Sequence, residues 1–496
     1  MTAAFDGWLM VLAVALPSLG VLLAIGLGGR WPERMALLAA PVGLAVALAM
    51  TAAVLRAGDA VTYALGGWSP PLGIALRADG LAAAMLLTTA LVVAAVTLFA
   101  CDEFRTAPGQ DEARAPVTFW TLLLAIWAAL NLVFLADDLF SLFVALELLT
   151  FAAVPMVCLD GRPETIAAAL RYLLFALLGS MLYLLGTGVI YGEQGTLDIV
   201  LLSTALRPTP AILLACSLMT VGLLAKAALF PLHLWLPPAH AGAPAPASAI
   251  LSALVVKAPL FLIVRLWFDV MPGVPDFAAG QILGALGAAA ILFGGVLALR
   301  QKRLKLLVAY STVAQIGYLF ILFPLVQLGS PDAWIGGILQ VVSHAIAKAA
   351  MFLAAGLIAQ RLGHDRIDEL GGIGRALPMT TLAFGLAGLS LMGLPPSGGF
   401  IAKWLLLLTA IQTGQWWWSL PLLLGGLLTG GYLLRVLAPS LAGGGIATTP
   451  VAPVRLHREA LVLALAACSI ALGLVPLTSF NLMQVGRLAG PALMVP

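Results

Sequence analysis

The residues of this 496-residue chain best able to do chemistry are ionisable side chains inside long apolar runs. One acid and six bases are of this kind: Glu147, Lys226, Lys257, Arg265, Lys348, Lys403 and Arg435. An ionisable group near a bilayer centre costs roughly 2.5 to 3.5 kcal/mol on insertion scales, and such groups usually mark an ion or proton path. We therefore expect these side chains to be paired or hydrated, and to carry the function.

An acid and a lysine in such runs can control each other's charge. Desolvation lowers the pKa of a lysine and raises that of a glutamate, whereas closeness within about 4 to 6 Å restores both charged forms. A Glu147–Lys226 pair that opens and closes would therefore change the proton affinity of Lys226. When Lys226 is neutralised, its proton could pass along waters towards Lys257. The alternative is a static buried ion pair that holds helices together.

His344 suits the centre of such a relay, because its unperturbed pKa near 6.5 allows both forms at working pH. Lys348 follows four residues later, so both side chains share one helical face. Lys403 would be the last group before release. The alternative that Lys257, Lys348 and Lys403 reach towards an interface stays open, and Arg265 and Arg435 are better candidates for it.

Apolar spans must position these groups. The chain is 62% hydrophobic and 9% charged, and it offers repeated runs of about 20 apolar residues, which is the length of a membrane-spanning helix. We predict an all-α polytopic membrane protein with about fourteen spans, starting near residues 8, 35, 78, 116, 138, 165, 208, 244, 276, 305, 333, 377, 417 and 459. Asp137 and Asp138 are expected at a helix end that faces water, and His240 in a loop. The longest connections are expected near 102–115, 192–207, 361–376 and 441–458, which leaves no room for a soluble domain.

Two spans carry prolines that should interrupt them. Pro231 follows Lys226, and Pro395 and Pro396 precede Lys403. Proline removes an amide donor and clashes with the preceding turn, so both helices should break, and such breaks survive only against protein or a water-filled cavity. His233 lies beside the first break, where it could bond freed carbonyls or join the relay.

The interruptions repeat along the chain. Lys257 follows Lys226 by 31 residues (257 − 226) and Arg435 follows Lys403 by 32 (435 − 403). Broken helices at corresponding positions of two halves indicate an inverted-repeat transporter. We predict a three-helix segment at 1–115, repeats at 116–268 and 276–440, and a C-terminal helix and tail at 441–496.

Charge between the spans predicts orientation. Most Lys and Arg residues fall in odd-numbered loops, so by the positive-inside rule these loops are cytoplasmic and both termini lie outside. The net charge of +3 is small and gives no support to a nucleic-acid role. We expect a multi-pass protein of a bacterial-type inner membrane.

Several segments resemble a known family of membrane subunits. The segments are LFVALELLTF, ALRYLLFALLGS, IYGEQGTLDI, LAKAALFPLHLWLPPAHAGAPAPASAILSALVVK, KRLKLLVAYSTVAQIGY, SHAIAKAAMFLAAG and GLPPSGGFIAKW. They look like the antiporter-like proton-translocating subunits of respiratory complex I (M/N-type), Mrp cation/proton antiporters (D-type) and energy-converting hydrogenases. Lysine at position 403 resembles the Mrp D-type, the hydrogenase-type and some complex I subunits, and disfavours the complex I M-type pattern. The match covers most of residues 116–440, in order.

The resemblance implies fourteen helices, two inverted five-helix repeats and a midplane chain of charged residues. By motif it assigns the relay to Glu147, Lys226, Lys257, His344, Lys348 and Lys403. Arg171 matches a basic position of the family, and we expect supporting roles for Arg171, His233, Lys305 and Arg435.

The expected function is proton translocation within a multisubunit membrane complex. No cofactor, metal or redox site is expected in this chain, so the driving reaction, redox or cation antiport, would belong to other membrane subunits. Whether Na⁺ moves as well as protons is left open by the sequence. Two other classes remain: a stand-alone transporter of a small solute, and a structural scaffold subunit.

Overall fold

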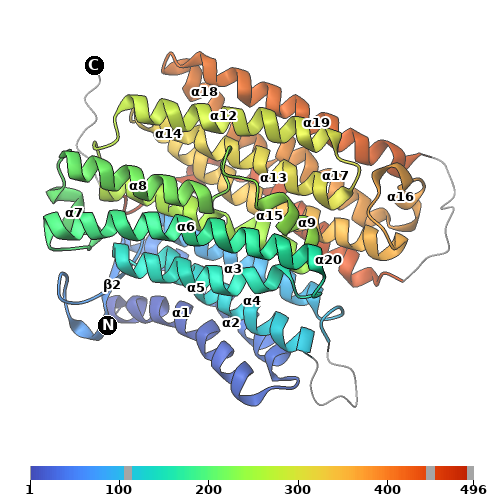
Figure 1. Cartoon of the computed structure of the whole chain (residues 1–496), viewed down its shortest axis with the longest axis horizontal. Coiled ribbons are helices and arrows are strands. Elements are labelled where there is room, and N and C mark those ends of the chain that lie inside the picture. The colour runs from blue at the N-terminus through green and yellow to red at the C-terminus, as the bar shows by residue number, and fades with distance from the viewer. Residues whose placement is uncertain (1, 106–113, 443–452, 489–496) are drawn as a thin grey trace. The chain divides into compact units, whose positions relative to one another are not determined.

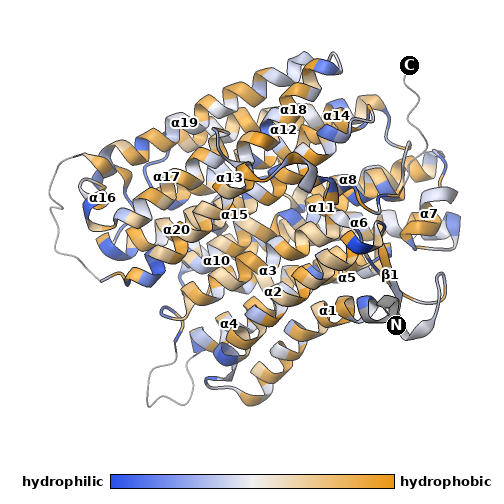
Figure 2. Ribbon diagram, turned by 180° about the vertical axis from the view of Figure 1, so that it is seen from behind, coloured by the Kyte–Doolittle hydropathy of each residue, from blue (hydrophilic) through white to orange (hydrophobic). Residues whose placement is uncertain are grey.

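Long apolar helices make up most of the chain (Figure 1). The structure is a computed structural model that describes residues 2–105, 114–442 and 453–488. Within them, twelve helices are long and apolar enough to span a membrane, and three shorter apolar helices cover Pro210–Lys226, Pro378–Met392 and Gly398–Gln412. Apolar residues run along the helices, and hydrophilic ones gather near helix ends (Figure 2). The all-α polytopic class is confirmed, while the count of fourteen spans stays a prediction.

One compact unit comprises residues 1–227, 254–280 and 481–496. Its helices are α1 (Thr2–Leu27), α2 (Trp31–Ala57), α3 (Gly80–Ala100), α4 (Arg114–Leu135), α5 (Leu139–Val157), α6 (Pro163–Gln194), α7 (Ile199–Ala205), α8 (Pro210–Lys226), α11 (Lys257–Arg265) and the π-helical η3 (Leu266–Val270). The antiparallel strands β1 (Val61–Ala64) and β2 (Ala75–Ala78) pair between α2 and α3.

The other unit comprises residues 228–253 and 281–480. Its helices are α9 (Leu236–Gly242), α10 (Ala245–Ile250), α13 (Leu304–Phe320), α14 (Leu322–Val326), α15 (Pro331–Leu362), α16 (Ile373–Ala376), α17 (Pro378–Met392), α18 (Gly398–Gln412), α19 (Ser419–Leu441) and α20 (Leu456–Ala471), with most of α12 (Phe277–Arg300). These units divide the chain differently from the predicted repeats, whose boundaries stay a prediction.

The expected helix interruptions are present. Helix α8 ends at Lys226, and residues 227–235 are not α-helical before α9 begins. Helix α17 ends at Met392, Gly393 adopts a left-handed φ of 87°, and Ser397 caps α18 by accepting a hydrogen bond from the Phe400 amide. The proline-based prediction of two breaks is therefore confirmed. The expected connections at 102–115 and 441–458 fall partly outside the described residues.

Helices α6 and α8 touch backbone to backbone at a pair of glycines. A Cβ atom at Gly179 would lie 2.5 Å from the carbonyl oxygen of Gly222, and one at Gly222 would lie 2.3 Å from that of Gly179. Real Cβ atoms do not approach that closely, so only glycine, which has no Cβ atom, fits at either position. Lys226 lies one turn after Gly222 on α8. The glycine contact therefore fixes the backbone from which the Lys226 side chain extends.

Candidate functional site

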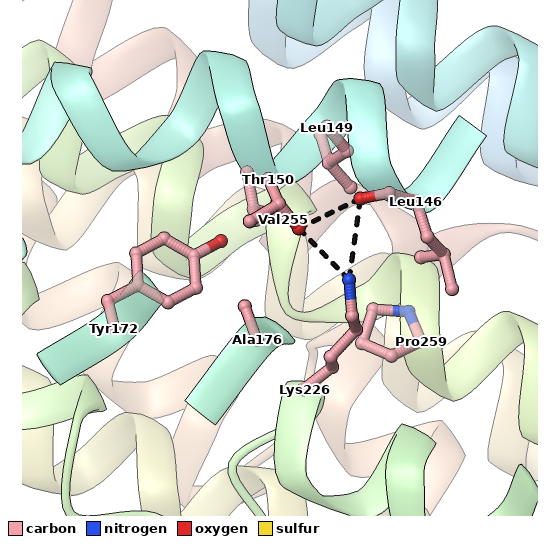
Figure 3. A pocket seen from close by; sticks show the side chains of 8 residues that line it. All are labelled: Leu146, Leu149, Thr150, Tyr172, Ala176, Lys226, Val255 and Pro259. Carbon is pink, nitrogen blue, oxygen red and sulfur yellow. Dashed lines mark hydrogen bonds between the residues drawn. The ribbon is translucent and has the colours of Figure 1, made fainter. Parts of the chain in front are cut away.

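Lys226 and Glu147 form the buried ion pair expected from the sequence. The Lys226 Nζ atom donates to Glu147 Oε1 at 3.0 Å. It also donates to Thr150 Oγ1 at 3.0 Å, with the Leu146 carbonyl at 3.5 Å (Figure 3). Ser180 of α6 also donates to Glu147. Lys226 is 6% exposed and the Glu147 side chain 17%. Three helices therefore hold one lysine ammonium among three acceptors.

A small cavity adjoins this ammonium. It measures about 10 Å³ and is lined by Leu146, Leu149, Thr150, Tyr172, Ala176, Lys226, Val255 and Pro259. On this measure it has room for about one water. Figure 3 shows the Tyr172 ring on the far side of Thr150 from Lys226. A single water here would contact both the ammonium and the hydroxyl groups around it.

Lys257 belongs to the helix that borders this cavity. It is fully buried at the start of α11, and Val255 and Pro259, two residues before and after it, line the cavity beside Lys226. A π-helical segment, η2 (Leu251–Val255), precedes it. Such segments occur frequently at functional sites.

In the other unit, Lys348 and His344 lie on one face of α15. His344 is 1% exposed and Lys348 is fully buried. Lys348 donates to the Val308 carbonyl at 3.0 Å and to the Ser311 hydroxyl, both on α13. Both of these acceptors are neutral oxygens.

Lys403 of α18 points back at the free carbonyl end of α17. Its Nζ donates to the carbonyls of Leu391 at 2.5 Å and Met392 at 3.4 Å, and it lies 3.8 Å from the centre of the Tyr318 ring. A cation is favoured at a helix C-terminus by the helix dipole and over an aromatic face by its quadrupole. The break thus creates a site for a positive charge.

Two glutamines that the sequence analysis missed extend from α15 to the carbonyl that Lys403 contacts. Gln340 donates to Gln315 Oε1 at 3.2 Å, and Gln315 donates at 3.0 Å to the Leu391 carbonyl that also accepts from Lys403. Gln340 and His344 are four residues apart on α15, as are His344 and Lys348. That spacing of polar residues in an apolar helix is the signal that could have identified Gln340.

The predicted supporting residues are not gathered around the lysines. Arg171 is exposed on α6. His233 is 3% exposed, with its ring 5.6 Å from that of Phe230 and 5.3 Å from that of Phe293. Lys305 donates to the Ala243 carbonyl, and Arg435 to the Leu299 carbonyl. Their supporting roles stay predictions.

Three expectations are wrong. Arg265 does not reach towards an interface: it is 7% exposed and donates to the carboxylates of Asp79 and Asp269. Asp137 does not face water, because connecting segments cover it and leave 5% exposed. His240 is fully buried in α9 rather than in a loop.

Comparison with known proteins identifies the family. A family model described as the transmembrane part of NADH:quinone oxidoreductase and Mrp antiporters matches residues 136–429, more than half of the chain. This chain belongs to the NADH:quinone oxidoreductase/Mrp antiporter membrane family. Within the family, it is 36% identical over 79% of its length to NADH-quinone oxidoreductase subunit N of Desulforudis audaxviator, covering 77% of that protein.

Other family members are similarly close. The chain is 30% identical to the D-type component of the Na(+)/H(+) antiporter of Bacillus subtilis, over 76% of this chain and 75% of the relative. A solved Mrp complex from a Dietzia species contains a chain that superposes with a TM-score of 0.87 at 26% identity, covering 97% of this chain and 96% of that one. The resemblance drawn from the sequence motifs is confirmed.

The described residues contain no group of three or more His, Cys, Asp and Glu side chains that could hold a metal ion. The buried polar side chains of the two units include lysines, arginines, histidines, carboxylates, glutamines and hydroxyl groups. Such groups can exchange hydrogen bonds and protons, which is the chemistry that this arrangement supports.

Proposed function

We propose that this chain is a proton-translocating antiporter-like subunit of a multisubunit membrane complex. The relatives are named as subunits of NADH-quinone oxidoreductase and of a Na(+)/H(+) antiporter, and they lend no support to a stand-alone solute transporter. The driving reaction, whether redox or cation antiport, belongs to partner subunits. Both termini lie on the outer face of a bacterial cell membrane, as the distribution of basic residues favours.

The observation that carries the proposal is the Lys226 site. A single carboxylate, a hydroxyl group and a water-sized cavity surround one ammonium. When Glu147 is paired with Lys226, both charges are stabilised; when the pair opens, the desolvated ammonium loses its counter-charge and tends to give up its proton. A water in the cavity would accept that proton.

Each unit contributes its own part of the relay. In the first unit the proton passes from Lys226 towards Lys257, whose flanking residues line the same cavity. In the second, Gln340 and Gln315 lead from α15 to the Leu391 carbonyl that Lys403 also contacts, and His344 and Lys348 follow Gln340 at four-residue spacing on α15. The amides reorient rather than titrate, so the lysines and the histidine carry the charge.

Vesicles containing the assembled complex test this function. Proton transport is measured with the wild type, Glu147→Gln, Lys226→Ala and the matched control Glu164→Gln, which changes an exposed glutamate in the first turn of α6. We expect the transport rate of both relay variants to fall about a hundredfold, the lower end of the contribution of a positioned acid or base, and that of the control to stay unchanged. Normal transport by Glu147→Gln and Lys226→Ala in fully assembled complexes would refute the relay.

A further inference from the structure

A second group of buried charges lies in the first unit, away from the Lys226 pair. Asp79, at the start of α3, is fully buried, and Asp269 in η3 is 1% exposed. Arg265 joins them: its guanidinium donates to both carboxylates, at 2.7 Å to Asp79 Oδ1 and 2.7 Å to Asp269 Oδ2. The Phe261 ring lies 4.9 Å from the guanidinium. The Arg265 guanidinium is therefore shared by the Asp79 and Asp269 carboxylates.

Asp137 is covered where α4 ends and α5 begins. Its amide donates to the Ala75 carbonyl of β2 at 3.2 Å, and its carbonyl accepts from the Ile199 amide at 3.0 Å. The segment before α7 also bonds Leu139 through the Leu197 carbonyl. The residue is thus fixed on both sides of its backbone by β2 (Figure 1) and by the segment leading into α7.

The C-terminal segment closes the same end of this unit. The Gly80 amide donates to the Val485 carbonyl at 2.9 Å, and Arg77 donates to the Gly486 carbonyl. A Cβ at Gly80 would lie 1.7 Å from the Leu482 carbonyl oxygen. The strand, the segment before α7 and the C-terminal segment all contact this end of the helices, and they leave Asp137 5% exposed.

The Asp137 carboxylate has no hydrogen-bond donor among the described residues, although it is about nineteen-twentieths buried. Asp269 Oδ1 is also buried, and it accepts no hydrogen bond from the described part of the chain. A buried ionised carboxylate without a donor is costly, so such a group usually shifts its pKa and becomes neutral. Two acceptors without donors therefore point to a missing proton.

The charges around Asp137 favour the protonated, neutral form of its carboxyl group. Its electrostatic neighbours are Arg77 on β2, Arg265 on α11, Asp79 at the start of α3 and Asp198 before α7. Asp138 caps α5, Asp269 lies beside Arg265, and Arg487 approaches from the C-terminal segment. Among the buried groups, the acids Asp79, Asp137, Asp198 and Asp269 face the bases Arg77 and Arg265, a net charge of −2 (2 − 4) if all are ionised. Burial raises the pKa of Asp137 to about 7 and also raises that of Asp198.

Helix α11 connects this group to the relay. Phe134 at the end of α4 packs edge-on against Phe261 at 5.0 Å, and Phe261 lies four residues from both Lys257 and Arg265 on the same face. Lys257 and Arg265 are separated by eight residues, or about 12 Å of helix at 1.5 Å per residue. One buried helix therefore presents a relay lysine at one end and the carboxylate group at the other.

We propose that Asp137 is a proton-binding site through which the first unit exchanges protons with water at this end of its helices. The carboxylate takes one proton from hydronium, which leaves water and a neutral carboxylic acid, and it releases the proton in the reverse step. As an exchange site for the relay it rests on the proposed function; as a proton-binding site it does not.

Infrared spectroscopy and transport, both on the assembled complex, test the proposal. The variants are Asp137→Asn, Glu147→Gln and the control Asp276→Asn, which alters an exposed carboxylate of the same unit whose capping role asparagine keeps. We expect a protonated-carboxyl band that titrates near neutral pH in the wild type and the control and is absent in Asp137→Asn. The transport rate of Asp137→Asn should fall about a hundredfold.

The outcomes separate this site from the relay. No carboxyl band titrating between about pH 6 and pH 8 in the wild type, or a band unchanged in Asp137→Asn, overturns the proposal, and the wild-type measurement decides even if the variant does not fold. Wild-type transport by an assembled Asp137→Asn complex also overturns it, while Glu147→Gln still tests the relay. Normal transport by Glu147→Gln refutes the relay alone.

Discussion

Replacing Asp137 by asparagine should change how the stability of the protein depends on pH. Burial raises the pKa of this carboxyl from 3.8 in the unfolded chain to about 7 in the folded one. Between those values the folded state binds more protons than the unfolded state, so the free energy of unfolding falls as pH rises. Below about pH 4 the residue has no effect, and above about pH 7 the full penalty applies.

The size of the penalty follows from the shift. About 3 pKa units at 1.36 kcal/mol per unit give on the order of 4 kcal/mol. Asparagine has the same shape as a neutral aspartic acid and cannot ionise. We therefore expect Asp137→Asn to match the wild type near pH 4 and to be more stable above pH 7, although its transport is impaired.

Unfolding of the purified protein in mixed detergent micelles, followed by circular dichroism at several pH values, measures this difference. Asp160→Asn is the control of opposite sign. Burial acts to raise the pKa of Asp160, but hydrogen bonds from Thr165 and Arg162 hold that pKa below its usual value. Asp160 therefore stabilises the protein above the unfolded pKa, and this contribution is lost as pH falls through the folded pKa. Equal pH slopes for the wild type and Asp137→Asn would show that the buried carboxyl does not retain its proton.

Two further substitutions test the packing of the first unit. Arg265→Gln leaves two buried carboxylates without their base and should lower the free energy of unfolding by about 3 to 5 kcal/mol. Asp269→Asn leaves Arg265 paired with Asp79 and should lower it by under about 1.5 kcal/mol. The same unfolding assay ranks the two variants, and equal losses of stability would contradict the assigned contacts. Gly222→Leu should force α6 and α8 apart because its side chain meets the Gly179 carbonyl, and we expect less assembled complex on native gels, with Gly192→Leu, where a Cβ has open space, as the control.

The fold class and the helix breaks could be predicted because they depend on local sequence. Apolar runs of about 20 residues leave few alternatives to a spanning helix. A proline removes a backbone donor wherever it occurs, and the chain does leave the helix after Lys226 and after Met392. The number of spans depends on where short and broken helices sit relative to a bilayer, which local sequence does not determine.

The Glu147–Lys226 pair could be anticipated because two opposite charges in apolar helices need each other. Gln315 and Gln340 could not be found in that way, because a neutral amide in an apolar run carries no charge that demands a partner. Their importance comes from the shared Leu391 carbonyl, 76 residues along the chain from Gln315. Sharing of that kind is a property of the packed helices.

The errors at Arg265 and Asp137 have one physical cause. Arg265 pairs with Asp79, 186 residues earlier, so its partner could not be recognised from neighbouring sequence. Asp137 follows a helix directly and looks solvent-exposed, but β2 and the segment before α7 cover it. Connecting segments that fold back over helix ends convert polar ends into buried sites.

The glycine contact between α6 and α8 limits how fast the two helices can move past each other. Two backbones in direct contact cannot slide without a collective rearrangement, which takes microseconds to milliseconds, whereas side-chain rotamers change in picoseconds to nanoseconds. Lys226 lies one turn beyond Gly222, so in the proposed relay its ion pair would open by a rotamer change of Lys226 or Glu147. That step would be fast, and the relay would then be limited by another step, such as hydration of the cavity.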